Sequence, residues 1–269
     1  MFNDQHLQLF IDEIFDYYGY DFAGYSHASF KRRLERVYQM GDFVSFQEFL
    51  YKIKSDTDYL TYVIEEITVN VTEMFRDPAF YKVLREEILP SLSSKPFIRI
   101  WHAGCSTGQE VYSMAILLQE EGLLSKSIIY ATDLNQTVLE NGKKGLFPLK
   151  LMKEYSENYR IAGGKKDFSE YYIANYGYAK FDEGLSKKMV FSQHNLVSDS
   201  SFNEFDLILC RNVMIYFDKD LQDRVLHLFD SSLAPLGYLA LGTKETLSFT
   251  SVYKNYEQVR KEKVWKKIK

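Results

Sequence analysis

Cysteine is scarce in this chain of 269 residues, which carries only Cys105 and Cys210. Two cysteines do not make a disulfide framework, and their spacing to the five scattered histidines follows no metal-binding pattern, so we expect no metal. Long apolar runs are also missing: none approaches the roughly 18 residues of a membrane span, and the N-terminal stretch MFNDQHLQLF has no basic flank. We therefore expect neither a signal peptide nor a membrane span, and a cytoplasmic protein.

An excess of positive charge is absent as well. The net charge of −4 argues against non-specific binding of nucleic acid, which needs a basic face. The charge is uneven: residues 1–90 hold 9 Lys and Arg against 16 Asp and Glu, a balance of −7, and the remaining 24 basic and 21 acidic residues give +3. Within the acidic part, Lys31, Arg32, Arg33 and Arg36 form a local basic cluster.

The most informative stretch runs from Ile98 to Glu110, IRIWHAGCSTGQE. Its apolar start predicts a buried strand, and Gly104 and Gly108 predict a turn that lets a ligand approach the main chain before a helix opens near Thr107. The dinucleotide fingerprint GxGxxG is absent, and no Gly-Lys-Ser/Thr follows to bind phosphates. This pattern suits a nucleoside ligand without a pyrophosphate, of which S-adenosylmethionine is the commonest.

Residues 1–92 carry the signals of a helical domain. The segment Ser45–Glu48 fits a capping box that opens a helix. Asp77-Pro78 places an N-cap and a first-turn proline before a helix that runs to about Leu89. The stretch from Pro90 to Pro96 then predicts a linker to a second domain, 93–269.

The second domain alternates between short apolar strands and helices. Strands are expected at Phe97–Ala103, Ile128–Asp133, Met189–His194, Phe205–Cys210 and Tyr238–Gly242, with helices near 109–121, 135–144 and 219–233. Such alternation predicts an α/β fold with a mostly parallel sheet covered on both faces. Ligands of such sheets bind beyond the carboxyl ends of the strands.

One connection, from Gly145 to Lys188, is too long to be an ordinary loop. It is rich in tyrosine and contains a Gly163-Gly164 turn, and its segments Tyr171–Ile173 and Ala174–Phe181 have the composition of strands. We infer a small inserted β subdomain at about 150–188.

Two acids follow predicted strands, and each has two interpretations. Asp133 ends the second strand, where an acid accepts hydrogen bonds from ribose hydroxyls; the alternative is an N-cap for the helix near Asn135. The ribose role is favoured two to one. Glu110 either closes a capping box with Thr107 or binds the ammonium of a methionine moiety, and the spacing leaves these even.

Polar residues also follow the later strands. Asn195 offers the donor and acceptor that read an adenine edge, although a loop Asn that satisfies its own turn is more common. Arg211 and Asn212 lie between two apolar runs, so their burial would require partners. Tyr216 is either a core aromatic or a phenol that points into a cleft.

The segment NVTEMFR, residues 70–76, lies in the helical part just before the Asp77-Pro78 helix start. Taken alone it is a helix end and a connection. The second interpretation is that this part closes over the cofactor and contributes Asn70, Thr72 and Arg76 to the site.

Several of these segments resemble one known family. IRIWHAGCSTGQEVYSMA, YATDLNQTVLENGKKGLF, FDLILCRNVMIYFD, LGYLALGTKETL and NVTEMFRDPAFY are similar to the CheR-type chemotaxis-receptor glutamate methyltransferases, in order from about Gly19 to the end. The resemblance implies a helical N-terminal domain and a Rossmann-like methyltransferase domain with a small β subdomain. It implies transfer of the methyl group of S-adenosylmethionine to receptor glutamates, with S-adenosylhomocysteine as product.

The resemblance also implies roles for individual residues. Arg76 and Tyr216 match residues thought to flank the transferring methyl group. Cofactor contacts are implied at the matching motif positions, which are Asn70, Thr72, Arg76, Glu110, Asp133, Asn195, Leu196, Cys210 and Arg211, beside the turn at Gly104. The implied partner is the cytoplasmic part of a membrane chemoreceptor. We expect the protein itself to be a monomer. The acidic N-terminal domain and the weakly matching β subdomain depart from the family pattern.

A glutamate carboxylate is already ionised at neutral pH, so the reaction needs no general base. Arg76 either orients the substrate carboxylate through paired N–H donors or binds the carboxylate of the cofactor. The leading function is therefore a protein-glutamate O-methyltransferase that acts in signal transduction. The alternatives are a module that binds the cofactor and reports it to a partner, and a methyltransferase for small carboxylic acids.

Overall fold

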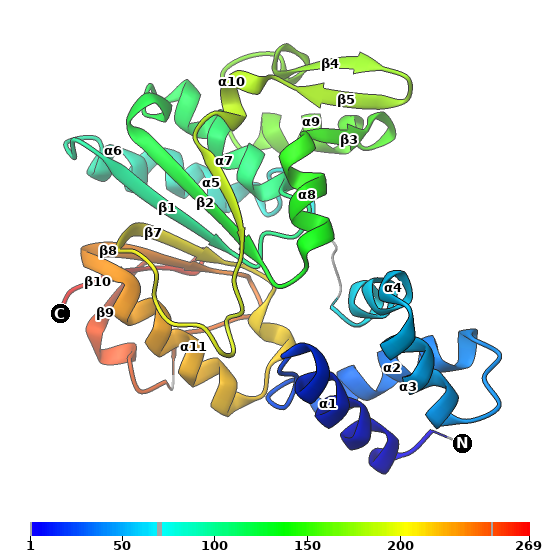
Figure 1. Ribbon diagram of the computed structural model, residues 1–269. Coiled ribbons are helices and arrows are strands. Elements are labelled where there is room, and N and C mark those ends of the chain that lie inside the picture. The colour runs from blue at the N-terminus through cyan, green and yellow to red at the C-terminus, as the bar shows by residue number, and fades with distance from the viewer. Residues whose placement is uncertain (1, 69–71, 249) are drawn as a thin grey trace.

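The computed structural model describes residues 2–68, 72–248 and 250–269. Its N-terminal part is built from α1 (Asp4–Tyr18), α2 (His27–Met40), α3 (Phe46–Ser55) and α4 (Thr57–Ile67), which enclose an aromatic-rich core of their own (Figure 1). The hydroxyl of Ser45 caps α3 by accepting from the N–H of Glu48 at 3.2 Å, as predicted. The Glu48 carboxylate, however, accepts from the N–H of Val44 at 2.7 Å, so the reciprocal bond lies one residue before the predicted one.

The next helical stretch extends past its predicted end. It consists of α5 (Pro78–Val83), the π-helical turn η1 (Leu84–Ile88) and α6 (Leu89–Leu92). Pro90 has no N–H to donate, and the wider turn just before it lets the helix continue through the proline. The predicted linker therefore begins later than Pro90. The apolar side chains of this stretch pack into the core of the sheet and not into the N-terminal core.

The main sheet has seven strands in the order β6-β2-β1-β7-β8-β10-β9. Their bounds are β1 Ile98–Ala103, β2 Ser127–Asp133, β6 Met189–Gln193, β7 Phe205–Cys210, β8 Leu233–Leu241, β9 Tyr256–Arg260 and β10 Val264–Lys267. Strands β6, β2, β1, β7 and β8 run parallel, and β10 and β9 add antiparallel pairs at one edge. The predicted α/β fold is confirmed. The sequence analysis missed β9 and β10, and β8 begins at Leu233 rather than Tyr238 through an irregular register beside Phe205.

Two apolar clusters cover the two faces of this sheet. One face packs against α7 (Gln109–Glu120), the α5–α6 stretch and the inserted subdomain. The other packs against α11 (Lys219–Ser232). The helix α8 (Gln136–Lys144) follows β2 and contacts β2 and β6. Both faces are thus buried, as the near-continuous apolar strands require.

The inserted subdomain is a three-stranded antiparallel sheet in the order β3-β5-β4, at the top of Figure 1. It combines β3 (Leu146–Pro148), α9 (Met152–Ile161), β4 (Tyr172–Asn175), β5 (Tyr178–Phe181) and α10 (Glu183–Ser186). Tyr176 and Gly177, with φ of 45° and 79°, make the hairpin turn. The predicted β subdomain is confirmed; it also contains the helix α9, which the sequence analysis did not predict.

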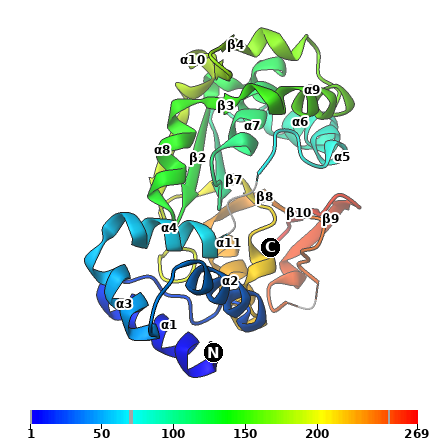
Figure 2. The ribbon, with the colours of Figure 1, turned by 90° about the vertical axis from the view of Figure 1, so that its right-hand side faces the viewer.

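The N-terminal helices lie below the carboxyl ends of the parallel strands, and the β subdomain lies at the opposite end of the molecule (Figure 2). Main-chain bonds join the N-terminal helices to the segment between β7 and α11: the N–H of Ser26 donates to the carbonyl of Tyr216 at 2.8 Å, and the N–H of Asp218 donates to that of Gly24 at 2.9 Å. Between them Tyr25 packs on Phe217, with ring centroids 5.1 Å apart. In the described part of the chain, no helix is long and apolar enough to cross a membrane.

Candidate active site

A cavity of about 990 Å³, counted to its open mouth, lies between the strand ends and the N-terminal helices. Of the residues predicted for the site, those that line the cavity are Thr72, Arg76, Gly104, Glu110, Asp133, Asn195, Leu196, Arg211 and Tyr216. Cys210 is fully buried in the core just before Arg211, and burial raises the pKa of its thiol. Asn70 lies outside the described residues.

The turn after β1 forms the floor of the cavity. Gly104 has a φ of +75°, and a Cβ there would come within 2.5 Å of Val213, so glycine is required on both counts. The N–H groups of Gly104 and Cys105 both donate to the carbonyl of Thr132 at the end of β2. These bonds attach the glycine turn to the end of β2. The turn therefore lies at the carboxyl ends of the strands, as predicted.

Asp133 braces this turn rather than capping α8. Its carboxylate accepts from the N–H of Ser106 at 2.8 Å and from that of Asn135 at 3.0 Å. The N-cap of α8 is Asn135, whose side chain accepts from the N–H of Thr137. Burial raises the pKa of Asp133, although these N–H donors act in the opposite direction. The interpretation of Asp133 as the N-cap of α8 is wrong. Its carboxyl group lines the cavity, so the ribose interpretation stays a prediction.

Glu110 does not close a capping box. The N-cap of α7 is Gly108 and has no side-chain bond, because Thr107 donates its hydroxyl to the side chain of Gln109. The Glu110 carboxylate instead receives His102 Nδ1 at 3.0 Å and Arg211 Nη1 at 2.9 Å. Burial raises the pKa of Glu110, but the bonds from His102 and Arg211 outweigh it and hold the pKa below its usual value.

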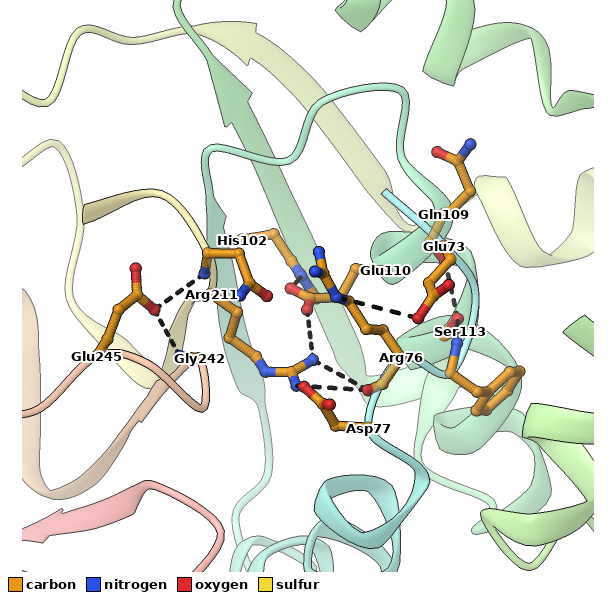
Figure 3. Close-up of polar contacts among 12 residues, drawn as sticks. Glu73, Arg76, Asp77, His102, Gln109, Glu110, Ser113, Arg211, Gly242 and Glu245 are labelled. Atoms are coloured by element: carbon orange, nitrogen blue, oxygen red, sulfur yellow. Dashed lines mark hydrogen bonds and ion pairs between the residues drawn. The ribbon is translucent and has the colours of Figure 1, made fainter. Parts of the chain in front are cut away.

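Arg211 connects the strand ends with the segment before α5 (Figure 3). Its side chain is 2% exposed and donates from Nη2 to Asp77 Oδ2 at 2.6 Å and from both terminal nitrogens to the Arg76 carbonyl. Its guanidinium also lies 4.1 Å from the centroid of the Phe80 ring. Asp77 therefore makes no cap bond to α5, contrary to the prediction, because Arg211 takes its carboxylate.

A buried acid that the sequence analysis missed holds the loop after β7. Glu245 accepts from the N–H groups of Gly242, Asn212, Val213 and Met214 at 2.6–3.0 Å. Figure 3 shows the bond from Gly242. It thereby fixes Asn212 at a φ of +62°, a left-handed conformation that this loop needs. The sequence signal was an acid three residues after Gly242, the glycine that follows an apolar strand.

Tyr216 faces the cavity and is covered by a second residue that the sequence analysis did not place there. The guanidinium of Arg33, from α2, lies 4.9 Å from the centroid of the Tyr216 ring. All three Arg33 nitrogens are buried and have no hydrogen-bond partner among the described residues. Arg33 belongs to the basic cluster, but its contact with Tyr216 depends on how the two domains pack.

Two further predicted residues have local partners. The side-chain oxygen of Asn195 accepts from the N–H of Val197 at 2.9 Å, as expected for an Asn that stabilises its own turn. The side chain of Asn195 also lines the cavity. Arg76 Nε lies 4.0 Å from Glu73 Oε1, and both side chains are about one third exposed at the cavity.

Comparisons with known proteins agree with this arrangement. Residues 70–263 match the family described as CheR methyltransferase, SAM binding domain, and residues 5–68 match the CheR methyltransferase all-alpha domain. Solved structures that resemble the chain include the plantazolicin methyltransferase BpumL in complex with SAH, a weak likeness at 13% identity and a TM-score of 0.40, over 87% of this chain and 61% of that one.

Curated relatives cover most of the chain. The Cher3 protein of Pseudomonas putida, named as a methyltransferase, is 45% identical over 98% of this chain and 97% of its own length. The chemotaxis protein methyltransferase of Listeria monocytogenes is 32% identical over 85% of both chains, and that of Vibrio anguillarum is 37% identical over 73% of this chain and 71% of its own. The chain therefore belongs to the CheR family of chemotaxis methyltransferases, and its cofactor is S-adenosylmethionine.

Proposed function

We propose that this protein transfers the methyl group of S-adenosylmethionine to glutamate side chains in the cytoplasmic part of a membrane chemoreceptor. The proposed domains are 1–92 and 93–269, as the sequence indicates, with residues 78–92 packed on the sheet of the second domain. We propose that the protein acts in the cytoplasm as a monomer. The observation that supports a glutamate substrate is the buried guanidinium of Arg33, which lies over Tyr216 in the cavity and has no hydrogen-bond partner among the described residues.

The chemistry of the lining residues fits S-adenosylmethionine along the length of the cavity. Glu110 is an ionised acid at one end, where the cofactor's ammonium would bind. Asp133 lies at the end of β2, where acids accept from ribose hydroxyls. Asn195 and Leu196 follow β6, where the adenine would lie. We assign these four residues to cofactor binding on that ground.

Two arginines at the cavity, Arg76 and Arg33, have the remaining roles. The carbonyl of Arg76 and the carboxylate of Glu110 are bound by the same guanidinium, so Arg76 belongs to the methionine end of the site. We therefore assign Arg76 to the cofactor's carboxylate and Arg33 to the carboxylate of the substrate. A buried cation without a partner is costly, and an incoming carboxylate would remove that cost.

The bound cofactor supplies an electrophilic methyl carbon on a sulfonium. A lone pair of the glutamate oxygen forms the new O–CH₃ bond, and the electrons of the broken S–CH₃ bond return to sulfur. No proton moves, so the protein's task is to align the carboxylate and exclude water. Well-oriented reactants gain on the order of 7–11 kcal/mol from such positioning.

The test is methylation of a receptor. Purified protein, methyl-labelled S-adenosylmethionine and a lysate from the source organism should yield base-labile label on a membrane-receptor band. Base-labile release identifies a carboxyl methyl ester. Tight binding of S-adenosylhomocysteine with no label on any protein would overturn the proposal in favour of a cofactor-binding module, and label on a small acid would overturn the protein substrate.

Replacing Asp133 with alanine should weaken cofactor binding more than it slows turnover at saturation. The change removes the expected ribose contact and the two bonds that Asp133 makes to Ser106 and Asn135. We expect the Kd for S-adenosylhomocysteine to rise about tenfold, as for loss of hydrogen bonds to a charged group. Calorimetry measures this, and an unchanged Kd would contradict it.

Arg76→Ala and Tyr216→Phe should both lower methylation without unfolding the protein. Arg76→Ala is expected to raise the KM for the cofactor about tenfold, because one charged contact is lost. Tyr216→Phe keeps the ring under Arg33 and removes only the hydroxyl, so kcat should fall while the KM for the cofactor stays constant. Steady-state kinetics beside thermal unfolding check both, and normal kinetics in both variants would reject these roles.

A further inference from the structure

The buried histidine of β1 has no role in the assignments above. His102 is 1% exposed, and strand alternation places it on the face that also carries Ile98 and Ile100, under α7. Its neighbours across the sheet are the apolar Ala131 and Leu209. A buried imidazole among such residues requires a reason, because unpaired polar groups are costly.

The geometry of His102 fixes where its hydrogen lies. Its Nδ1 lies 3.0 Å from Glu110 Oε1, and Nε2 is buried without a partner among the described residues. An ionised carboxylate only accepts, so Nδ1 carries a hydrogen and donates it to Glu110. The ring reaches the carboxylate from the side opposite to Arg211 in Figure 3.

We propose that His102 is a positioning residue, which holds the Glu110 carboxylate in the orientation that receives the cofactor's ammonium. Between them, His102 and Arg211 bind one Glu110 oxygen each, so the carboxylate cannot rotate about its own axis. The inference rests on the proposed role of Glu110 as the ammonium acceptor.

Two variants separate positioning from packing. His102→Asn keeps a donor on the atom bonded to Cγ but does not titrate, and His102→Leu keeps the volume and removes the donor. We expect the Kd for S-adenosylhomocysteine at pH 8, measured by calorimetry, to rise about tenfold in His102→Leu and to be restored to within about twofold in His102→Asn. Turnover at saturating cofactor should change little in either variant.

Recovery of affinity in His102→Asn is the readout that a purely structural role would not produce. If His102→Leu fails to fold by urea titration, His102→Asn decides alone, and a loss of affinity of about tenfold in it would overturn the inference. Wild-type affinity in His102→Leu would also overturn it. Wild-type affinity in Glu110→Gln would instead reject the underlying assignment of Glu110.

Discussion

Replacing Arg211 with methionine is expected to lower the free energy of unfolding by about 3–5 kcal/mol and to abolish measurable cofactor binding. The substitution keeps most of the volume but leaves Glu110 and Asp77 without the guanidinium that binds both. Uncompensated buried charge is what makes such changes severe, and here the carboxylate left unpaired is also the predicted ligand for the cofactor. Urea unfolding at pH 7 measures the first effect and calorimetry with S-adenosylhomocysteine the second.

The matched control is another arginine with a carboxylate partner. Arg160 pairs with Glu157 at 2.6 Å, but both side chains are more than half exposed, so Arg160→Met should change stability by at most about 0.5 kcal/mol. A loss as small in Arg211→Met would contradict the account of the site.

The effect of pH on Arg211→Met follows from the same carboxylate. In the wild-type protein the pKa of Glu110 is held low, so its contribution to stability is present above the unfolded value and is lost as pH falls through the folded one. Without Arg211, burial pushes the pKa of Glu110 up, and protonation then relieves an unpaired charge. The stability gap between variant and wild type should therefore narrow below about pH 5.

Replacing Arg33 with methionine is expected to lower kcat/KM for the receptor about 100-fold while the protein becomes no less stable. The loss corresponds to a charge-assisted, bidentate contact with the substrate carboxylate. Stability should hold or rise, because the buried guanidinium has no partner among the described residues and its removal relieves a desolvation cost. Methylation kinetics and thermal unfolding of the same preparation test both signs together.

The control for Arg33 lies on the same helix. Arg36 is exposed and belongs to the same basic cluster, so Arg36→Met removes an equal charge without touching the cavity. It should leave kcat at saturating receptor unchanged, and any effect on KM should shrink with added salt. Equal losses of kcat in both variants would mean that the cluster acts through general charge and that Arg33 has no separate contact with the substrate.

Local sequence patterns predicted the glycine turn and its strand, because both depend on nearby residues. The same patterns could not decide between the two interpretations of Glu110 or foresee the partner of Asp77. In each case the carboxylate forms bonds inside the fold in place of the local helix cap. Glu110 binds His102 and Arg211, and Asp77 binds Arg211. Charged bonds inside the fold outweighed the weaker preference of a helix start.

Other features depended on packing that no local pattern records. The strands β9 and β10 carry many charged residues at the sheet edge, so their apolar periodicity is faint. Arg33 comes to Tyr216 only because α2 packs under the strand ends. The proposed domain boundary at residue 92 stays a prediction.

The short antiparallel contact between residues 24–26 and 216–218 links the helical domain to the loop that carries Tyr216. Gly24 leaves no space for a side chain, since a Cβ there would come within 2.9 Å of Leu221. A swing of the helices away from the sheet would break both main-chain bonds and carry Arg33 off the tyrosine ring. If S-adenosylhomocysteine leaves by such a swing, its release would also separate Arg33 from Tyr216. The contact between these two residues would then form again each time a new S-adenosylmethionine is bound.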